Sequence, residues 1–330
     1  MKLEQMPRYP LLTPLQRMEN LEQALGCGPL YIKRDDLTPL GLGGNKTRKL
    51  EFLLGDALAG GADTLVTVGG VQTNHGRLTA AAAAKAGLAC TLVLDGARPE
   101  KLSGNLLLDC LLGASLVYTD GRSTSAVIEE TLAALQAAGR APYFIPEGGS
   151  NAVGSAGYLA MVPELLAQAD SLPVPPARLV CTMGSLGTFA GLWLGARAFG
   201  APFSVTGVAV NPTTGYTREK AAALVNEMSA AYGLDIAAAP EDMDIIYADA
   251  AHDYAGPGYN VPDAKTRGAV ELLARTEGIF LDPCYTAKSF RGFCDIAREL
   301  DGGAIFVHTG GTPALWTQEH LDAFAADYWN

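Results

Sequence analysis

The sequence predicts an α/β protein with two open, twisted parallel-sheet domains. Short runs of β-branched residues alternate along the chain with longer Ala- and Leu-rich amphipathic stretches. This alternation is typical of parallel strands joined by right-handed helical crossovers. A length of 330 residues exceeds one typical core and favours two domains. A hydrophobic content of 48% suits a well-packed protein.

The elements follow from these runs in chain order. We expect strands at 29–35, 63–69, 89–95, 114–120, 141–146, 177–183, 203–210, 278–283 and 303–309. We expect helices at 47–61, 74–87 and 125–139, among others. The segment 169–179 contains three prolines and predicts a connection between units.

Charge and cysteine content exclude some classes of protein. A net charge of −11 argues against sequence-independent nucleic-acid binding, although a small pocket can still be positive. The six cysteines form no C-x-x-C pair, and Cys90, Cys181 and Cys284 are predicted to be buried free thiols. The first ten residues contain no apolar signal region, and no membrane-length apolar run occurs. We therefore expect a cytoplasmic protein without a membrane partner or a metal site.

The loop 41–51 carries the first chemical signal, at the start of a predicted helix. Lys46 lies at the helix entrance, followed by Arg48 and Lys49. Helix amides and cations attract anions, and neighbouring cations ease the deprotonation of a nucleophilic lysine. These residues could equally be ordinary surface cations. A nucleotide-hydrolase phosphate loop fits less well, because Asn45 stands where that motif has glycine.

Three further loops follow predicted strands, where parallel sheets gather functional groups. Loop 68–77 offers Gln72, Thr73, Asn74 and His75, which could grip a carboxylate or simply cap a helix. Loop 181–192 combines glycines and hydroxyls into a phosphate cradle, or into a common Gly-Ser turn. Loop 281–289 would turn Tyr285 and Thr286 toward the same cleft, or the tyrosine could serve packing alone.

Together these loops supply an amine, a phosphate cradle and a carboxylate grip, as pyridoxal phosphate with an amino-acid substrate requires. The chain resembles, along essentially its full length, the D-cysteine desulfhydrase and 1-aminocyclopropane-1-carboxylate deaminase family of fold-type-II pyridoxal-phosphate enzymes. The resemblance is carried by IKRDDLTPLGLGGNKTRKLEF, GGVQTNHGR, GGSNAVGSAGY, GPGYNVPD, DPCYTAKS and HTGGTPAL.

The resemblance implies a role for each matching residue. Lys46 forms a Schiff base with the cofactor and later acts as the base, and Asn74 meets the cofactor's 3-hydroxyl. The implied phosphate ligands are Lys49, Gly184, Ser185, Leu186, Gly187 and Thr188. Thr73, Asn74 and His75 hold the substrate carboxylate, and Thr286 meets the ring nitrogen. Tyr259 and Tyr285 match two active-site tyrosines and join Lys46 and Thr73 as catalytic residues.

Two positions indicate the branch of the family. Thr286 replaces the glutamate, and His75 the glutamine, that are typical of the deaminases. Both favour β-elimination of D-cysteine to pyruvate, ammonia and hydrogen sulfide. L-cysteate sulfo-lyase and cyclopropane deaminase activities stay open. Thr73 and Asn260 depart from the usual serine and glycine, which also leaves open a cofactor-bearing binding protein without turnover.

The resemblance also implies the domain organisation. Residues 1–47 and 158–330 would form the large cofactor-binding domain, and 48–157 a small inserted α/β domain. The family fold is that of the tryptophan synthase β chain, and a homodimer is expected.

Overall fold

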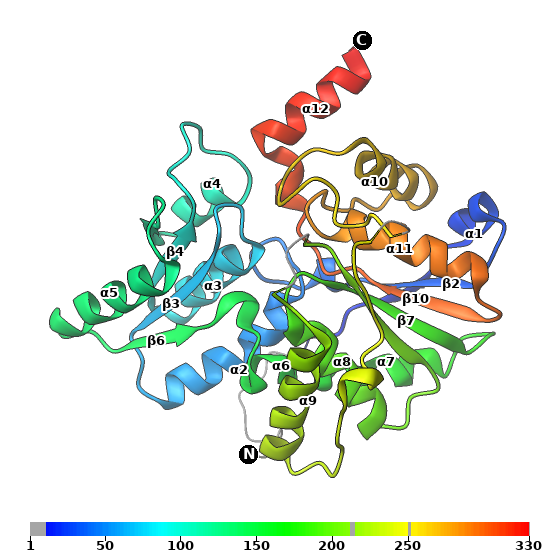
Figure 1. The fold of residues 1–330 in the computed structure, drawn as a ribbon, viewed down its shortest axis with the longest axis horizontal. Helices are drawn as coiled ribbons and strands as arrows, with labels where there is room; N and C mark the ends of the chain where they lie inside the picture. The colour runs from blue at the N-terminus through cyan, green and yellow to red at the C-terminus, as the bar shows by residue number, and fades with distance from the viewer. Residues whose placement is uncertain (1–10, 212–214, 250–251, 330) are drawn as a thin grey trace.

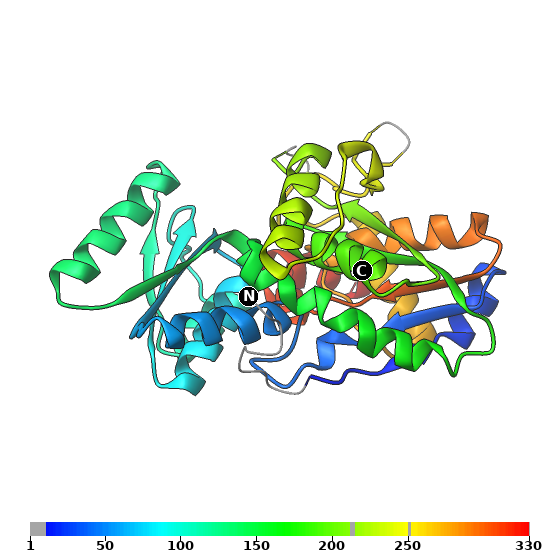
Figure 2. The same ribbon diagram turned by 90° about the horizontal axis from the view of Figure 1, so that it is seen from below.

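Two separate sheets, each covered by helices, organise the molecule (Figures 1 and 2). The computed structural model describes residues 11–211, 215–249 and 252–329. One sheet has six strands in the order β1-β2-β10-β7-β8-β9, and the other has four in the order β5-β4-β3-β6. All neighbouring strands are parallel except β1 and β2. The predicted pair of parallel-sheet α/β units is confirmed.

The strands of the described residues are β1 (Leu15–Arg17), β2 (Leu30–Lys33), β3 (Thr64–Gly70), β4 (Ala89–Asp95), β5 (Ser115–Tyr118), β6 (Pro142–Ile145), β7 (Pro176–Met183), β8 (Ser204–Ala209), β9 (Ile245–Ile246) and β10 (Gly303–Val307). The α-helices are α1 (Glu19–Leu25), α2 (Lys46–Ala59), α3 (Asn74–Ala86), α4 (Gly104–Leu111), α5 (Thr124–Ala137), α6 (Ala152–Leu159), α7 (Met161–Ala169), α8 (Leu186–Ala198), α9 (Arg218–Tyr232), α10 (Ala264–Glu277), α11 (Thr286–Glu299) and α12 (Gln318–Trp329).

The predicted strand at 278–283 is wrong, whereas each other predicted strand overlaps an observed one. Gly278 ends α10 in the left-handed conformation, and Phe280 is 59% exposed. At the end of the segment the Asp282 side chain accepts the amides of residues 284–286 and builds a turn. The apolar residues Ile279 and Leu281 pack on α11 without joining a sheet.

The sequence suggested that the proline-containing segment 169–179 connects two structural units. The segment does not connect the two sheets. It joins α7 to β7, and β7 already belongs to the six-stranded sheet. The chain instead passes between the sheets through α2 and α6, and the predicted domain boundaries fall inside these two helices. Residues 1–10 of the predicted large domain lie outside the described residues.

The large sheet is apolar on both faces because helices cover both. Along β7, Leu179 and Cys181 pack on the side of α8, whereas Val180 packs on the side of α11. Ile305 and Phe306 of β10 divide between the same two faces. This packing holds the strand ends, and the loops that follow them, in fixed positions.

The cysteines are free thiols, and Cys90, Cys181 and Cys284 are buried as predicted. Among the described residues, none of the helices combines the length and apolar character that a membrane crossing requires.

Candidate active site

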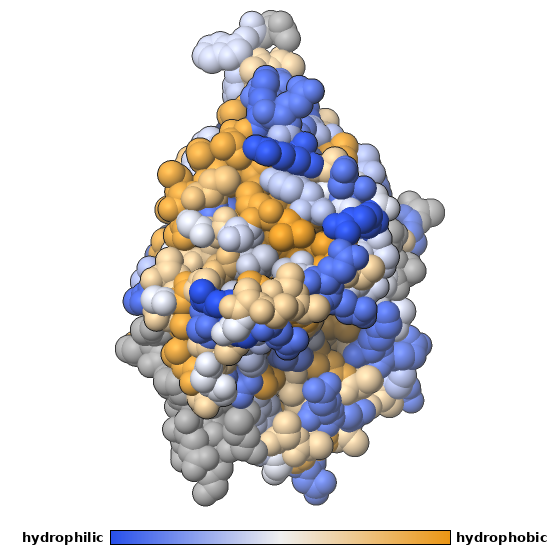
Figure 3. All heavy atoms as spheres, turned by 90° about the vertical axis from the view of Figure 1, so that its left-hand side faces the viewer, coloured by the Kyte–Doolittle hydropathy of each residue, from blue (hydrophilic) through white to orange (hydrophobic). Residues whose placement is uncertain are grey.

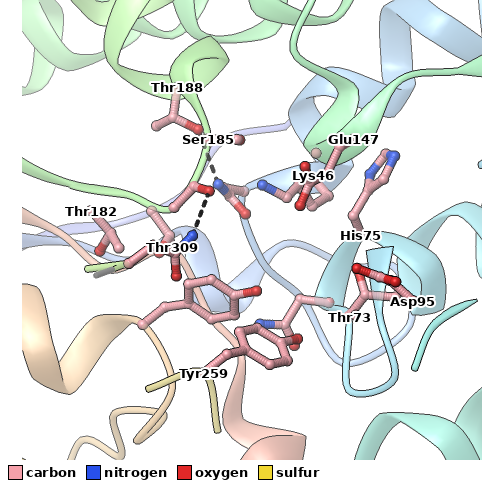
Figure 4. Close-up of a pocket in the computed structure, with 17 residues that line it drawn as sticks. Lys46, Thr73, His75, Asp95, Glu147, Thr182, Ser185, Thr188, Tyr259 and Thr309 are labelled. Atoms are coloured by element: carbon pink, nitrogen blue, oxygen red, sulfur yellow. Dashed lines mark hydrogen bonds between the residues drawn. The ribbon is translucent and has the colours of Figure 1, made fainter. Parts of the chain in front are cut away.

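A cavity of about 410 Å³ lies where the carboxyl ends of both sheets meet (Figure 4). Gly70 ends β3 and Asp95 ends β4, while Glu147 follows β6. Thr182 lies near the end of β7, and Thr309 follows β10. The cavity is thus built from strand ends of two sheets, as expected for open parallel sheets.

The structure brings most of the predicted site residues into this cavity. Those that line it are Lys46, Thr73, Asn74, His75, Gly184, Ser185, Thr188, Tyr259 and Tyr285. Lys49, Leu186, Gly187 and Thr286 do not line it. Lys49 and Gly187 lie together behind the wall, since a Cβ on Gly187 would come within 2.7 Å of the Lys49 Nζ.

Lys46 is the first residue of α2 and lies at one end of the cavity with Glu147 and Ser185 (Figure 4). The preceding residue is fixed, because the Asn45 amide donates to the Thr309 carbonyl at 3.0 Å. Burial lowers the pKa of Lys46 to about 8, while the Glu147 carboxylate raises it. From the sequence, neighbouring cations were expected to lower the pKa of Lys46, but loss of hydration is the main cause.

Arg48 points away from the cavity, which corrects its expected part in anion attraction. Its guanidinium donates to Asp35 at 2.8 and 2.9 Å and to Glu164 at 2.9 Å. Asp35 also accepts the Tyr158 hydroxyl at 2.6 Å. This buried network fixes the far side of α2 and thereby the position of Lys46.

Lys49 is fully buried, and among the described residues no carboxylate forms an ion pair with it. Its Nζ donates to the Gly148 carbonyl at 2.9 Å and to the Ser150 hydroxyl at 3.4 Å. Burial, and secondly the Lys46 charge, lowers the pKa of Lys49 well below its ordinary value. A buried amine of this kind lacks the anion that would stabilise its ammonium form.

The start of α8 lies beside Lys49 and also suits an anion. Ser185 stands at the capping position of this helix, but its own side chain makes no capping hydrogen bond. The Ser150 hydroxyl contacts both the Ser185 hydroxyl at 3.0 Å and the Gly187 amide at 3.1 Å. This region therefore combines helix N-terminal amides, a buried lysine and the hydroxyls of Ser150, Ser185 and Thr188. Together these groups form a seat with the chemistry of a phosphate site.

Thr73 both caps α3 and lines the cavity, so its capping role does not exclude contact with a substrate. Its hydroxyl accepts the Gly76 amide at 3.2 Å. A Cβ on Gly76 would lie 2.4 Å from the Thr73 methyl group. The glycine therefore makes room for threonine where the family usually has serine.

His75 is the second residue of α3, is 2% exposed and lines the cavity. Burial, and then the charges of Lys46 and Lys49, lower the pKa of His75 well below its ordinary value. The imidazole is therefore neutral at neutral pH and can donate or accept one hydrogen bond in the cavity.

Tyr259 and Tyr285 face each other with ring centroids 5.9 Å apart in an edge-to-face arrangement. Their place in the cavity wall, away from bulk water, raises the pKa of both phenols well above the ordinary value. Both hydroxyls are therefore protonated and can donate. A Cβ at residue 184 would lie 2.8 Å from the Tyr285 ring, so glycine is needed there.

Thr286 is fully buried behind Tyr285. Its hydroxyl donates to Asp282 Oδ1 at 2.6 Å and accepts the Asp282 amide at 2.7 Å. These bonds build the turn that presents Tyr285 to the cavity. Sequence reasoning missed Asp282, whose spacing to Thr286 was a usable turn signal, and it gave Thr182 and Thr309 no role.

Comparisons with known proteins identify the family of the chain. The model of the family "Pyridoxal-phosphate dependent enzyme" matches residues 9–310. The D-cysteine desulfhydrase of Yersinia enterocolitica is 41% identical, covering 96% of this chain and 97% of that protein. A provisionally named 1-aminocyclopropane-1-carboxylate deaminase of Pyrococcus abyssi is 39% identical, covering 95% and 94%.

A solved structure of an ACC deaminase homologue superimposes with a TM-score of 0.87 at 35% identity, covering 98% of this chain and 97% of the other. The predicted fold type is thereby confirmed. The chain belongs to the pyridoxal-phosphate-dependent enzymes, in the group that includes the D-cysteine desulfhydrases and 1-aminocyclopropane-1-carboxylate deaminases.

Proposed function

We propose that the chain eliminates the β-substituent of D-cysteine, giving pyruvate, ammonia and hydrogen sulfide. The observation that carries the proposal is the half-buried amine of Lys46, which has a pKa of about 8 and lies beside the seat suited to a phosphate. The choice of D-cysteine as substrate rests on the relatives named D-cysteine desulfhydrase, which are about 40% identical over nearly the whole chain.

The residues present fit pyridoxal phosphate. Lys49, the start of α8 at residues 184–188 and the Thr188 hydroxyl would hold its phosphate, and Asn74 would meet its 3-hydroxyl. When bound, the cofactor supplies an aldehyde for an amine and a ring that withdraws electrons from the substrate's α-carbon. The Lys46 Nζ would hold it covalently.

Lys46 would also move the proton. An amine with a pKa near 8 is partly neutral at physiological pH, so its Nζ can take the proton from the substrate α-carbon. The start of α3, with Thr73 and the neutral His75, would bind the substrate carboxylate. Tyr259 and Tyr285 hold protons that either could donate to the departing sulfur.

The charges at the cavity mouth favour a thiol over a sulfonate leaving group. Asp95 and Glu147 line the cavity and are exposed, and no arginine of the described residues lines it. A β-sulfonate would bring a second anion toward these carboxylates, whereas the thiol of cysteine can enter neutral. L-cysteate is therefore the less suitable substrate.

Thr309 is a better candidate for the ring nitrogen than Thr286. The Thr286 hydroxyl already donates a hydrogen bond to the Asp282 side chain and accepts one from the Asp282 main-chain N–H. Thr182 lines the cavity but shares a 2.6 Å hydrogen bond with Ser289. Thr309 lines the cavity close to Asn45, and its hydroxyl can form a hydrogen bond with a ligand there. A hydroxyl partner there would keep the ring a moderate electron sink, which suits a good leaving group.

A pyruvate-release assay across D-cysteine, L-cysteine, L-cysteate, D-serine and 1-aminocyclopropane-1-carboxylate tests the assignment. D-cysteine should give the highest kcat/KM, with sulfide formed in equal amount. Preference for L-cysteate with sulfite release would contradict the charge argument. Ammonia and 2-oxobutyrate from the cyclopropane substrate would instead assign a deaminase, and a yellow protein inactive on all five would be a binding protein.

We propose a division into a large domain of residues 1–47 and 158–330 and an inserted domain of 48–157. All strands of the four-stranded sheet lie within the second range, and all those of the six-stranded sheet lie outside it. Expression of 48–157 alone would test it: a folded fragment supports the division, and an unfolded one opposes it.

We also propose a homodimer located in the cytoplasm. Leu107 and Leu111 of α4 are 40% and 74% exposed, and Trp316 and Leu321 near the chain end are 54% and 44% exposed. Figure 3 shows apolar side chains on this side of the molecule, below the projecting C-terminal end. Such exposure suits a second copy, which sedimentation velocity would detect. The free thiols fit a reducing compartment.

A further inference from the structure

Asn105, near the start of α4, reaches the cavity wall from behind without lining the cavity. The residue is fully buried. Its side-chain amide donates to Asn74 Oδ1 at 2.8 Å and to the Gln72 main-chain carbonyl at 2.8 Å. Both of its side-chain N–H groups are therefore used, one on an active-site residue and one on the backbone.

These two bonds determine which way the Asn74 amide faces. A main-chain carbonyl can only accept, so the Asn105 atom facing Gln72 must be the nitrogen. The same nitrogen contacts Asn74, and the Asn74 atom that it meets must then be the oxygen. The Asn74 NH₂ is left on the other side, near Gly311, where a Cβ would come within 2.8 Å of it.

Gln72 and α4 hold each other in place. The Gln72 Oε1 accepts a hydrogen bond from the Asn105 main-chain N–H at 2.9 Å. The Gln72 Nε2 donates to the Ser103 main-chain carbonyl at 3.2 Å. The side-chain amides of Gln72 and Asn105 are thus each anchored to backbone groups that cannot reverse their role. The arrangement fixes orientation more firmly than a single hydrogen bond between two side chains would.

We propose that Asn105 is a positioning residue that holds the Asn74 NH₂ toward the cavity as a donor to the cofactor's 3-hydroxyl oxygen. This rests on the proposed function, in which Asn74 meets that oxygen. An N–H donor there favours the anionic form of the oxygen and strengthens cofactor binding. Without Asn105 the Asn74 amide can turn its own oxygen toward the ligand and repel it.

A double-mutant cycle with Asn105→Leu and Asn74→Ala tests the proposal on the protein loaded with pyridoxal phosphate. Asn105→Leu should weaken cofactor binding about tenfold, the worth of one hydrogen bond. It should also raise the pH midpoint of the visible absorption band by about one unit. Asn74→Ala should do the same, and the double variant should equal Asn74→Ala, because Asn105 acts only through Asn74.

The outcomes separate this role from a merely structural one. Effects of the two substitutions that add fully in the double variant would overturn the proposal, as would an unchanged midpoint in Asn105→Leu. If Asn105→Leu fails to fold, judged by circular dichroism, the smaller Asn105→Ser replaces it with the same expectations. A wild-type protein that shows no visible band overturns the proposed function as well, whereas a normal wild-type band with an unaltered variant overturns this inference alone.

Discussion

Replacing Lys46 by methionine tests the burial of its amine without any turnover. Burial lowers the pKa of Lys46 from 10.5 to about 8. At about 1.4 kcal/mol per pKa unit, folding then disfavours the ammonium form by at most about 3.5 kcal/mol. Water in the cavity reduces this figure, because the side chain is only half-buried. Methionine keeps the chain length without the charge, so cofactor-free Lys46→Met should be more stable than the wild type.

The pH dependence of this gain follows from proton binding. Between pH 8 and 10.5 the unfolded chain keeps a proton that folded Lys46 has released, so wild-type stability rises with pH across this window. Below pH 8 both states are protonated and the full penalty applies. The advantage of Lys46→Met should therefore be largest at neutral pH and shrink as the pH approaches 10.5.

Urea unfolding of the cofactor-free proteins at neutral and alkaline pH measures the difference directly. Lys101→Met is the matched control, because Lys101 is exposed and its substitution should change stability by less than about 0.5 kcal/mol. A Lys46→Met protein that is less stable than the wild type, or whose advantage does not change with pH, would refute the reasoning.

Three other substitutions probe the supports of the site. Lys49→Met should weaken pyridoxal-phosphate binding about 10- to 100-fold by calorimetry, since a charged partner of the phosphate is lost; an unchanged Kd would contradict the phosphate seat. Arg48→Met leaves the buried Asp35 carboxylate without its ion-pair partner, while Glu164 keeps its ion pair with Lys33. The substitution should lower the free energy of unfolding by about 3–5 kcal/mol in urea, whereas a loss below about 1 kcal/mol would contradict the network. Lys288 donates to the carbonyls of residues 255 and 258, just before Tyr259. Lys288→Met should reduce kcat about tenfold with little change in KM, and Lys288→Arg should recover part of it; equal loss in both would oppose this role.

The sequence predicted the cavity well where a loop follows an apolar strand. Lys46, Thr73 and Ser185 each stand at a junction between a loop and a helix, and such junctions carry local signals in glycine and hydroxyl content. Asp95 and Glu147 carried no comparable signal, because an acidic residue after an apolar run is common. Their place in the cavity depends on how the two sheets pack, which no local pattern contains.

Side-chain direction was the other part that the sequence could not provide. Arg48 and Lys49 are adjacent, yet one joins a buried network behind α2 and the other the phosphate seat. Thr286 lies next to Tyr285 but turns inward to Asp282. Asn260, where the family usually has glycine, adopts a φ of 54°, a left-handed conformation that asparagine tolerates. That substitution therefore keeps the backbone that glycine would allow.

Reduction of the native protein with borohydride in the presence of pyridoxal phosphate, followed by peptide mapping, tests the central claim most directly. The account predicts one modified lysine, at position 46, in the peptide that begins α2. Modification of another lysine, or of none, would contradict it.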